Sequence, residues 1–342
     1  MRTEGSVPPV MEEFQLDNAI SLGALTKSFG ARKAVDDLSL DVPRGSLCGF
    51  IGPNGAGKTT TLRMITGILQ PDTGVISVLG LASALLARSK IGYLPEERGI
   101  YRKMRVREFL AYMGQLKGVP MAVLSNRIRS RLRELGLEKQ AGERCDELSR
   151  GTQQKVQFLA AVLHEPQLLI LDEPLTGLDP VSALLLRQVI RAEHDRGTTI
   201  VLSTHAMEQA EEVCDHIVMI NHGRKVLDDT VAAIRGHYDP QVIRLEPLQE
   251  RVDDAALRLL PEVARVARDG AGGFEIHLVR GADPGDAIAR VAALVPARRI
   301  ELAHRRLEEI FISIVSAAQG APTQLRAAGS TPPPARPAGD QV

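Results

Sequence analysis

The hydrophobic pattern along the chain predicts strands that alternate with helices. Two apolar runs, at 47–51 and 168–171, have the length of fully buried strands. The run at 35–42 instead alternates apolar with polar residues, which is the period of a half-buried antiparallel strand. Further strands are expected at 20–26, 75–78, 91–94, 198–202, 217–220 and 224–227, the last two forming a hairpin.

Apolar residues recur at spacings of three and four over 106–135, which predicts helical structure between two strands of a parallel sheet. Other helices are expected at 59–69, 83–89, from 149 onward, at 184–190 and after residue 205. Ser149 is a suitable N-cap for the helix that follows it. Strands alternating with helices indicate an α/β fold whose parallel sheet is covered on both faces.

The periodicity restarts near residue 240 and predicts a second, smaller unit. Strands and helices there follow the order β-α-β-β-α-β, which is typical of a ferredoxin-like α+β sandwich, and a last helix follows at 307–315. The predicted division is a flexible N-terminal arm at 1–16, a main domain at 17–237 with a helical subdomain at about 96–165, an accessory domain at 238–316 and a disordered tail at 317–342.

Composition narrows the function classes. The 342 residues hold 42 basic and 42 acidic side chains, so no net charge favours nucleic acid, and 3% aromatics with no tryptophan argue against base-stacking platforms. Three widely separated cysteines, Cys48, Cys145 and Cys214, fit a reducing compartment. With no secretory signal and no apolar run long enough to cross a bilayer, we expect a cytoplasmic protein whose membrane role depends on a partner.

The stretch 52–60 fits the P-loop pattern, since it lies between a predicted strand and a predicted helix. Its glycines let successive backbone N–H groups surround phosphate oxygens, and the helix N-terminus adds a positive dipole end. Lys58 would reach the β- and γ-phosphates and the Thr59 hydroxyl would bind Mg²⁺. The expected cradle consists of Gly52, Pro53, Asn54, Gly55, Ala56, Gly57, Lys58, Thr59 and Thr60.

A second group of polar residues follows two later strands. Asp172 and Glu173 end the apolar run at 168–171, where paired carboxylates are costly unless a cation compensates them. We expect Asp172 to hold Mg²⁺ through its water shell and Glu173 to polarise the water that attacks the γ-phosphate. His205, just beyond the next strand, would contact the γ-phosphate and help Glu173 hold that water.

The order of these motifs resembles the nucleotide-binding subunit of an ABC transporter over about residues 17–235. Considered by itself, Phe29 could equally be a ring that stacks on a nucleotide base or an aromatic side chain packed in a turn. In the family pattern it takes the place of the A-loop aromatic. The resemblance further implies a Q-loop residue at Glu96 that contacts the Mg²⁺ water shell, and a D-loop residue at Asp179. It also implies a signature sequence in which Ser149 and Gly151 bind the γ-phosphate.

Two departures from the family pattern stand out. Glu96 occupies a position where the family usually has glutamine, which adds negative charge near ATP, and Arg150 replaces a signature glycine. Together with the stretch 93–101 and the C-terminal unit, these departures are similar to the branch that includes sodium-extruding and antibiotic-resistance exporter ATPases.

The resemblance implies an ATPase with Mg²⁺ that works as a head-to-tail homodimer, in which each ATP lies between the P-loop of one copy and the signature of the other. Lys58, Glu173 and His205 would be the catalytic residues. A separate membrane permease would contact residues 95–117, which places the subunit at the inner face of the cell membrane, and no nucleic acid is expected as a partner.

Two other functions fit the sequence less well. Soluble ABC ATPases that act on ribosomes or nucleic acid usually carry two P-loops, a long coiled-coil insertion or zinc-binding cysteines, and this sequence has none of them. A GTPase switch would need an Asn-Lys-x-Asp motif to read the base, which is also missing, and would leave the signature helix unexplained. The transporter interpretation therefore accounts for more of the chain.

Overall fold

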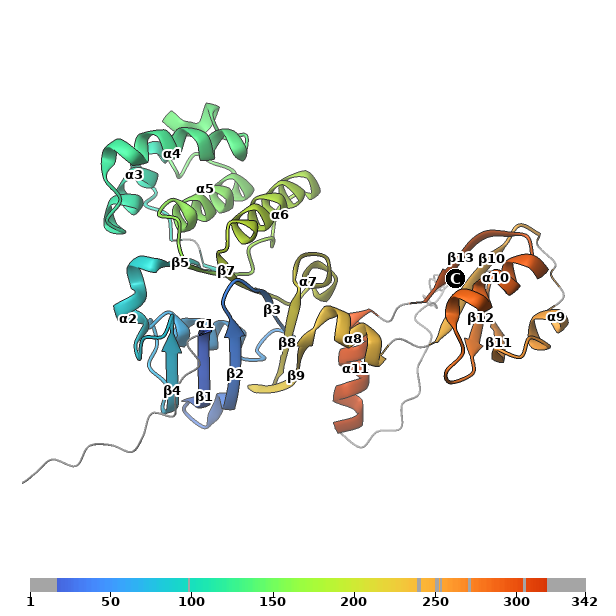
Figure 1. Ribbon diagram of the computed structural model, residues 1–342. Helices are drawn as coiled ribbons and strands as arrows, with labels where there is room; N and C mark the ends of the chain where they lie inside the picture. The colour runs from blue at the N-terminus through green and yellow to red at the C-terminus, as the bar shows by residue number, and fades with distance from the viewer. Residues whose placement is uncertain are drawn as a thin grey trace, which may run out of the picture.

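The computed structural model describes residues 17–318, apart from 98, 239–240, 250–251, 253, 270–271 and 304–305 (Figure 1). The predicted N-terminal arm and residues 319–342 of the predicted tail lie outside the described residues. The strands and helices expected from the sequence are present near their predicted places, and several are longer than the pattern indicated. The helix predicted at 59–69 is shorter and ends at Ile65, and the helix Val231–Tyr238 was not predicted.

The strands are β1 (Asn18–Phe29), β2 (Arg32–Pro43), β3 (Leu47–Ile51), β4 (Thr73–Val78), β5 (Ile91–Leu94), β6 (Leu168–Asp172), β7 (Thr199–Thr204), β8 (His216–Asn221), β9 (Arg224–Thr230), β10 (Val242–Pro247), β11 (Val263–Arg268), β12 (Phe274–Leu278) and β13 (Ala297–Leu302). The α-helices are α1 (Lys58–Ile65), α2 (Ala84–Ala87), α3 (Val106–Leu116), α4 (Met121–Glu134), α5 (Arg150–Val162), α6 (Pro180–Asp195), α7 (Met207–Val213), α8 (Val231–Tyr238), α9 (Ala255–Arg258), α10 (Pro284–Leu294) and α11 (Leu307–Ala318).

A six-stranded sheet with the order β5-β6-β7-β3-β8-β9 forms the centre of the first domain. Its strands run parallel except for β9, which pairs antiparallel with β8. Successive side chains of β6 enter opposite cores, because strand residues alternate between the two faces of a sheet. Leu169 packs with the helical layer, whereas Leu168 packs toward a second sheet. This two-sided burial explains why the strand is apolar throughout.

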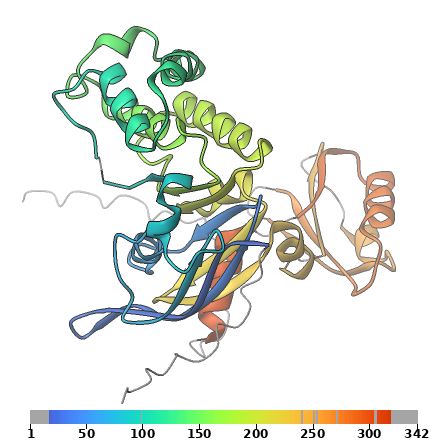
Figure 2. The same cartoon turned by 60° about the vertical axis from the view of Figure 1, so that its left-hand side comes forward.

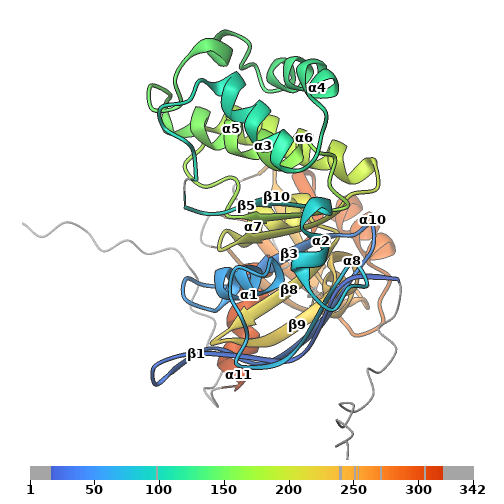
Figure 3. The ribbon, with the colours of Figure 1, turned by 90° about the vertical axis from the view of Figure 1, so that its left-hand side faces the viewer.

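The second sheet is antiparallel, three-stranded and ordered β2-β1-β4. Helix α1 packs into the core between the two sheets through Leu62, Met64 and Ile65, which are buried. Figure 3 shows α1 beside the parallel strands, with β1 on its other side. The N-terminus of α1 is thereby held at the end of β3, where the P-loop joins them.

Helices α3, α4, α5 and α6 form a layer on the opposite side of the six-stranded sheet (Figure 2). The helical pattern predicted over 106–135 divides into α3 and α4, because Gly118 adopts a positive φ and Pro120 stands at the N-cap of α4. The two helices pack closely at Gly114, where an added Cβ would come within 2.3 Å of Leu124. This layer carries the signature segment at the start of α5.

The C-terminal sheet has the order β11-β12-β10-β13 with every neighbouring pair antiparallel. Helices α9 and α10 add Leu257, Ala287 and Val291 to its core. The strand order and the intervening helices agree with the predicted ferredoxin-like α+β topology.

The last helix, α11, lies apart from that sheet and packs against the first domain. Leu307 and Ile310 are buried in the same core as Met207 and Ala210 of α7. Figures 1 and 2 both show α11 beside β8 and β9 rather than beside α10. The division at residue 238 stays a prediction. Within the described residues, the chain leaves the first domain through α8 and returns to it through α11.

Candidate active site

The P-loop joins β3 to α1, and two of its glycines have no room for a side chain. An added Cβ would lie 2.1 Å from the Ile220 carbonyl oxygen at Gly52 and 2.4 Å from the Ala34 carbonyl oxygen at Gly57. Both glycines also have positive φ, which L-residues rarely adopt. Glycine at these two positions therefore lets the loop lie against the neighbouring backbone and take the turn that phosphate-binding loops require.

Lys58 is buried and lies folded against its own loop. Its Nζ donates to the Gly52 carbonyl oxygen at 2.6 Å and to the Pro53 carbonyl oxygen at 3.2 Å. Burial lowers the pKa of Lys58, while the charges of Glu173 and Asp172 oppose that shift. The ammonium group thus lies beside buried carboxylates, where it supplies the compensating charge that they need.

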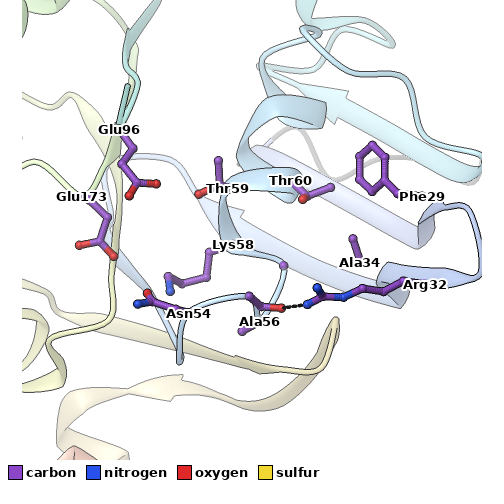
Figure 4. Close-up of a pocket in the computed structure, with 12 residues that line it drawn as sticks. Phe29, Arg32, Ala34, Asn54, Ala56, Lys58, Thr59, Thr60, Glu96 and Glu173 are labelled. Carbon is purple, nitrogen blue, oxygen red and sulfur yellow. Dashed lines mark hydrogen bonds between the residues drawn. The ribbon is translucent and has the colours of Figure 1, made fainter. Parts of the chain in front are cut away.

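A pocket of about 430 Å³ opens above this loop (Figure 4). Ten of the predicted site residues line it together with two that were not predicted, and the full lining is Phe29, Arg32, Ala34, Asn54, Gly55, Ala56, Gly57, Lys58, Thr59, Thr60, Glu96 and Glu173. Phe29 is 55% exposed at one end of the pocket, while Glu96 and Glu173 lie at the other (Figure 4). An exposed ring at the pocket rim offers a face on which a base can stack.

Asp172 ends β6 next to the P-loop helix. The Thr59 hydroxyl donates to Asp172 Oδ1 at 3.3 Å, and the Ser203 hydroxyl donates to the same oxygen. Asp172 Oδ2 is buried with no hydrogen-bond partner in the described part of the chain, and burial raises the pKa of this carboxyl group. A buried oxygen without a partner beside a threonine hydroxyl fits a hard divalent cation such as Mg²⁺.

Glu173 has a strained backbone and a carboxylate held by three hydrogen bonds. Its φ of +52° lies in the left-handed region, which is sparsely populated by non-glycine residues. Oε1 accepts hydrogen bonds from the His205 backbone N–H at 3.0 Å and from His205 Nδ1 at 2.9 Å, and Oε2 accepts one from the Thr176 hydroxyl at 2.9 Å. The structure thus brings Glu173 and His205 together, as the sequence predicted.

Seven predicted residues do not line this pocket. Gly52, Pro53, Asp172 and His205 contact residues that do line it, whereas Ser149, Gly151 and Asp179 belong to the signature and D-loop segments. Ser149 and Asp179 act as N-caps, Ser149 accepting from the Thr152 N–H at 3.2 Å and Asp179 from the Ser182 N–H at 3.0 Å. Gly151 lies in the first turn of α5, next to Leu178. The nucleotide-binding role predicted for these three residues stays a prediction, and it requires a second copy of the chain.

Sequence reasoning missed three polar side chains at this site. Arg32 donates to the Gly55 carbonyl oxygen at 3.2 Å, while Thr176 and Ser203 donate to Glu173 and Asp172 respectively. Ser203 could have been found, because it lies two residues before His205 at the end of a strand. For the other two, the sequence offers only their proximity to predicted site residues.

Comparison with known proteins shows the family. The family model described as ABC transporter matches residues 35–176. YhaQ, an ABC transporter ATP-binding protein of Bacillus subtilis, is 36% identical over 300 residues, which cover 87% of this chain and 99% of the relative. Nod factor export ATP-binding protein I of Rhizobium sp. strain N33 is 37% identical over 279 residues, covering 75% of this chain and 92% of the relative.

The chain belongs to the ABC transporter ATP-binding protein family. A solved ATP-binding subunit of an ABC transporter is 33% identical and superposes with a TM-score of 0.61, covering 64% of this chain and 93% of that one. The structure of cbiO1 from Clostridium perfringens shares the fold at 23% identity, with a TM-score of 0.57 and coverage of 64% of this chain and 90% of that one. The predicted P-loop ABC ATPase fold is therefore confirmed.

Proposed function

We propose that this ABC protein hydrolyses ATP to drive export through a separate membrane permease. The observation that supports this most strongly is that the pocket lined by the P-loop also holds Thr59, which is hydrogen-bonded to Asp172, and Glu173, which is hydrogen-bonded to His205. Phosphate binding, metal binding and water activation each need one of these groups, and together they are the parts of a phosphoryl-transfer site.

The phosphates of ATP would bind at the N-terminus of α1. The N–H groups of the P-loop and the helix dipole stabilise negative charge there. On binding, Lys58 would exchange its contacts with the Gly52 and Pro53 carbonyl oxygens for phosphate oxygens. Phe29 would stack on the base at the other end of the pocket.

Thr59 and Asp172 would hold Mg²⁺, with Glu96 facing the same pocket as a further carboxylate. The bound ion would neutralise charge that develops on the phosphate oxygens. Ser203 holds Asp172 through one oxygen and leaves Oδ2 for this role.

Glu173 would act as the general base for the attacking water. His205 orients the carboxylate through two hydrogen bonds to Oε1, so that the side chain does not rotate away from the pocket. The surrounding burial strengthens these interactions, because fewer water molecules compete for the carboxylate.

The complete site would require two copies of the chain. Ser149 and Arg150 are exposed at the N-terminus of α5, and neither lines the chain's own pocket. A helix N-terminus that presents backbone N–H groups to solvent can bind the γ-phosphate of an ATP held by a second copy. A head-to-tail dimer that closes on ATP and opens after hydrolysis would transmit this motion to the permease.

A mixing experiment tests the shared site. Lys58→Ala and Gly151→Asp should each abolish turnover, but an equimolar mixture should recover about a quarter of the wild-type rate, because half of the dimers are mixed and each of these holds one intact site. The φ of Gly151 is not positive, so its backbone conformation is open to other residues. An added Cβ would lie 3.4 Å from Leu178, which is an ordinary contact distance, so the replacement should leave α5 folded. ATPase activity that stays absent in the mixture would contradict the shared site.

Several observations support a separate permease and an export direction. No helix among the described residues is long and apolar enough to cross a membrane. Two similar proteins also support the proposal, since one is a Nod factor export ATP-binding protein and the other, cbiO1, is part of the ABC transporter complex cbiONQ. We therefore place the subunit on the cytoplasmic face of the membrane, held there by its permease.

The permease would bind the exposed side of α3 and the segment before it. Tyr101, Tyr112 and Leu116 are exposed there by 51%, 37% and 62%, and the two tyrosine rings meet edge to face with centroids 5.4 Å apart. Exposed aromatic and aliphatic side chains of this kind are typical of interface centres. They lie within the range 95–117 predicted to dock the partner.

We expect the full-length chain to co-purify with the polytopic membrane protein encoded by the neighbouring gene. Leu116→Asp should lower the recovered subunit by roughly tenfold, because it puts an unpaired charge into an apolar contact. Leu248→Asp is the matched control, since Leu248 is 59% exposed on the C-terminal unit. Equal recovery of both variants would contradict this docking surface.

A further inference from the structure

We propose that Thr176 is a positioning residue for the general base, holding the carboxylate oxygen of Glu173 that accepts the proton of the attacking water. The inference rests on the proposed ATPase function and deepens it, because it assigns separate roles to the two carboxylate oxygens. Thr176 does not line the nucleotide pocket and acts through Glu173 alone.

The hydrogen bonds of Glu173 divide its two oxygens. Oε1 accepts two bonds from His205, at 3.0 and 2.9 Å, which uses both of its lone pairs. Oε2 accepts one bond from the Thr176 hydroxyl, at 2.9 Å, and keeps one lone pair. Oε2 is therefore the oxygen with capacity left for a proton, and Thr176 sets the direction in which that lone pair points.

Local backbone geometry makes Thr176 well placed for this role. The Thr176 N–H donates to the Glu173 carbonyl oxygen at 3.3 Å, which closes a turn directly after the general base. Inside that turn the Thr176 hydroxyl reaches Oε2 of the same glutamate. Glu173 sits at a strained φ of +52°, which persists only where surrounding contacts stabilise it, and the Thr176 turn is one of these contacts.

The position of Thr176 also allows substitution without loss of the fold. Thr176 is exposed, whereas Glu173 is only 7% exposed. Valine keeps the branched shape and removes the hydroxyl, and exposed substitutions of this kind usually change the free energy of unfolding little. A change in turnover would therefore report on the carboxylate rather than on the stability of the domain.

We expect Thr176→Val to lower kcat for ATP hydrolysis by roughly five- to tenfold, which is the effect of losing one hydrogen bond that acts in the transition state. KM for ATP and nucleotide affinity should stay within about twofold, because the pocket lining is untouched. Thr176→Ser keeps the hydroxyl and should restore kcat to within about twofold. A wild-type kcat in the valine variant, or a serine variant as slow as the valine variant, would overturn the proposal.

A double-mutant cycle separates this role from an independent one. In a Glu173→Gln background, adding Thr176→Val should leave the residual single-turnover rate unchanged, since the hydroxyl acts only through the carboxylate. A further fall by the same factor would show that Thr176 acts elsewhere and would contradict the inference. A wild-type chain without ATPase activity would instead contradict the proposed function, and this inference with it.

Discussion

Replacing Glu173 with glutamine will lower the ATPase kcat by at least about 100-fold while ATP still binds, because the amide cannot take a proton from the attacking water. The side chain keeps its size, so the lining of the nucleotide pocket is preserved. With hydrolysis blocked, the ATP-bound dimer should accumulate. Steady-state ATPase assays, together with size-exclusion chromatography in the presence of ATP and Mg²⁺, measure both effects.

Glu97→Gln provides the matched control for this variant. Glu97 follows the pocket residue Glu96, and its side chain is 85% exposed and pairs with Arg63 at 3.1 Å. The same chemical change there removes a solvent-exposed ion pair, which typically contributes little, and should leave kcat within about twofold. A Glu173→Gln variant that turns over ATP at the wild-type rate would remove Glu173 from the mechanism.

Lys58→Ala should weaken ATP binding by roughly 100-fold, since a charged hydrogen-bond donor to phosphate contributes on the order of 3 kcal/mol. The substitution also removes the positive charge that interacts with the buried carboxylates of Asp172 and Glu173, so their negative charge repels the phosphates further. Isothermal titration calorimetry gives the affinity directly. The rise in melting temperature with ATP should shrink in parallel, because ligand stabilisation depends on the dissociation constant.

The control for the lysine variant is Lys33→Ala. The side chain of Lys33 is 59% exposed and pairs with Asp36 at 2.9 Å, and Lys33 is the sequence neighbour of the pocket residue Arg32. Loss of this exposed ammonium group changes the net charge by the same amount but should alter ATP affinity by less than about twofold. Equal affinities of the Lys58→Ala variant and the wild type would contradict the phosphate cradle.

Much of the site could be predicted because its signals are local. A strand, a glycine-rich loop and a helix follow one another within residues 47–65, so the P-loop is visible without any long-range contact. Asp172 and His205 could be placed at the same edge because the carboxyl ends of parallel strands meet there. The hydrogen bonds from Thr59 to Asp172 and between His205 and Glu173 confirm that these groups converge.

The missed residues are those whose type carries no signal of its own. Threonine is common in loops, so nothing in the sequence distinguishes Thr176 before its hydroxyl group is seen on Glu173. Ser203 is marked only by its place two residues before His205, and its contact with Asp172 is seen only in the structure. Arg32 resembles any exposed basic residue until the turn after β1 brings it to the Gly55 carbonyl oxygen. The Arg32 and Ser203 contacts join segments that are far apart in the sequence, and the Thr176 contact depends on a sharp turn of the backbone.

By itself, the sequence determined most of the order of strands and helices, the P-loop and the paired carboxylates. Each of these is predicted from residues that are close together in the sequence: the hydrophobic period, the positions of glycines and the ends of strands. Only the tertiary structure decided where α11 packs. An apolar helix face fits a core in either domain, and Ile310 is buried beside α7 rather than against the C-terminal sheet. The tertiary structure also decided which hydroxyl group meets each carboxylate, since such pairing depends on distances between atoms that no local pattern encodes.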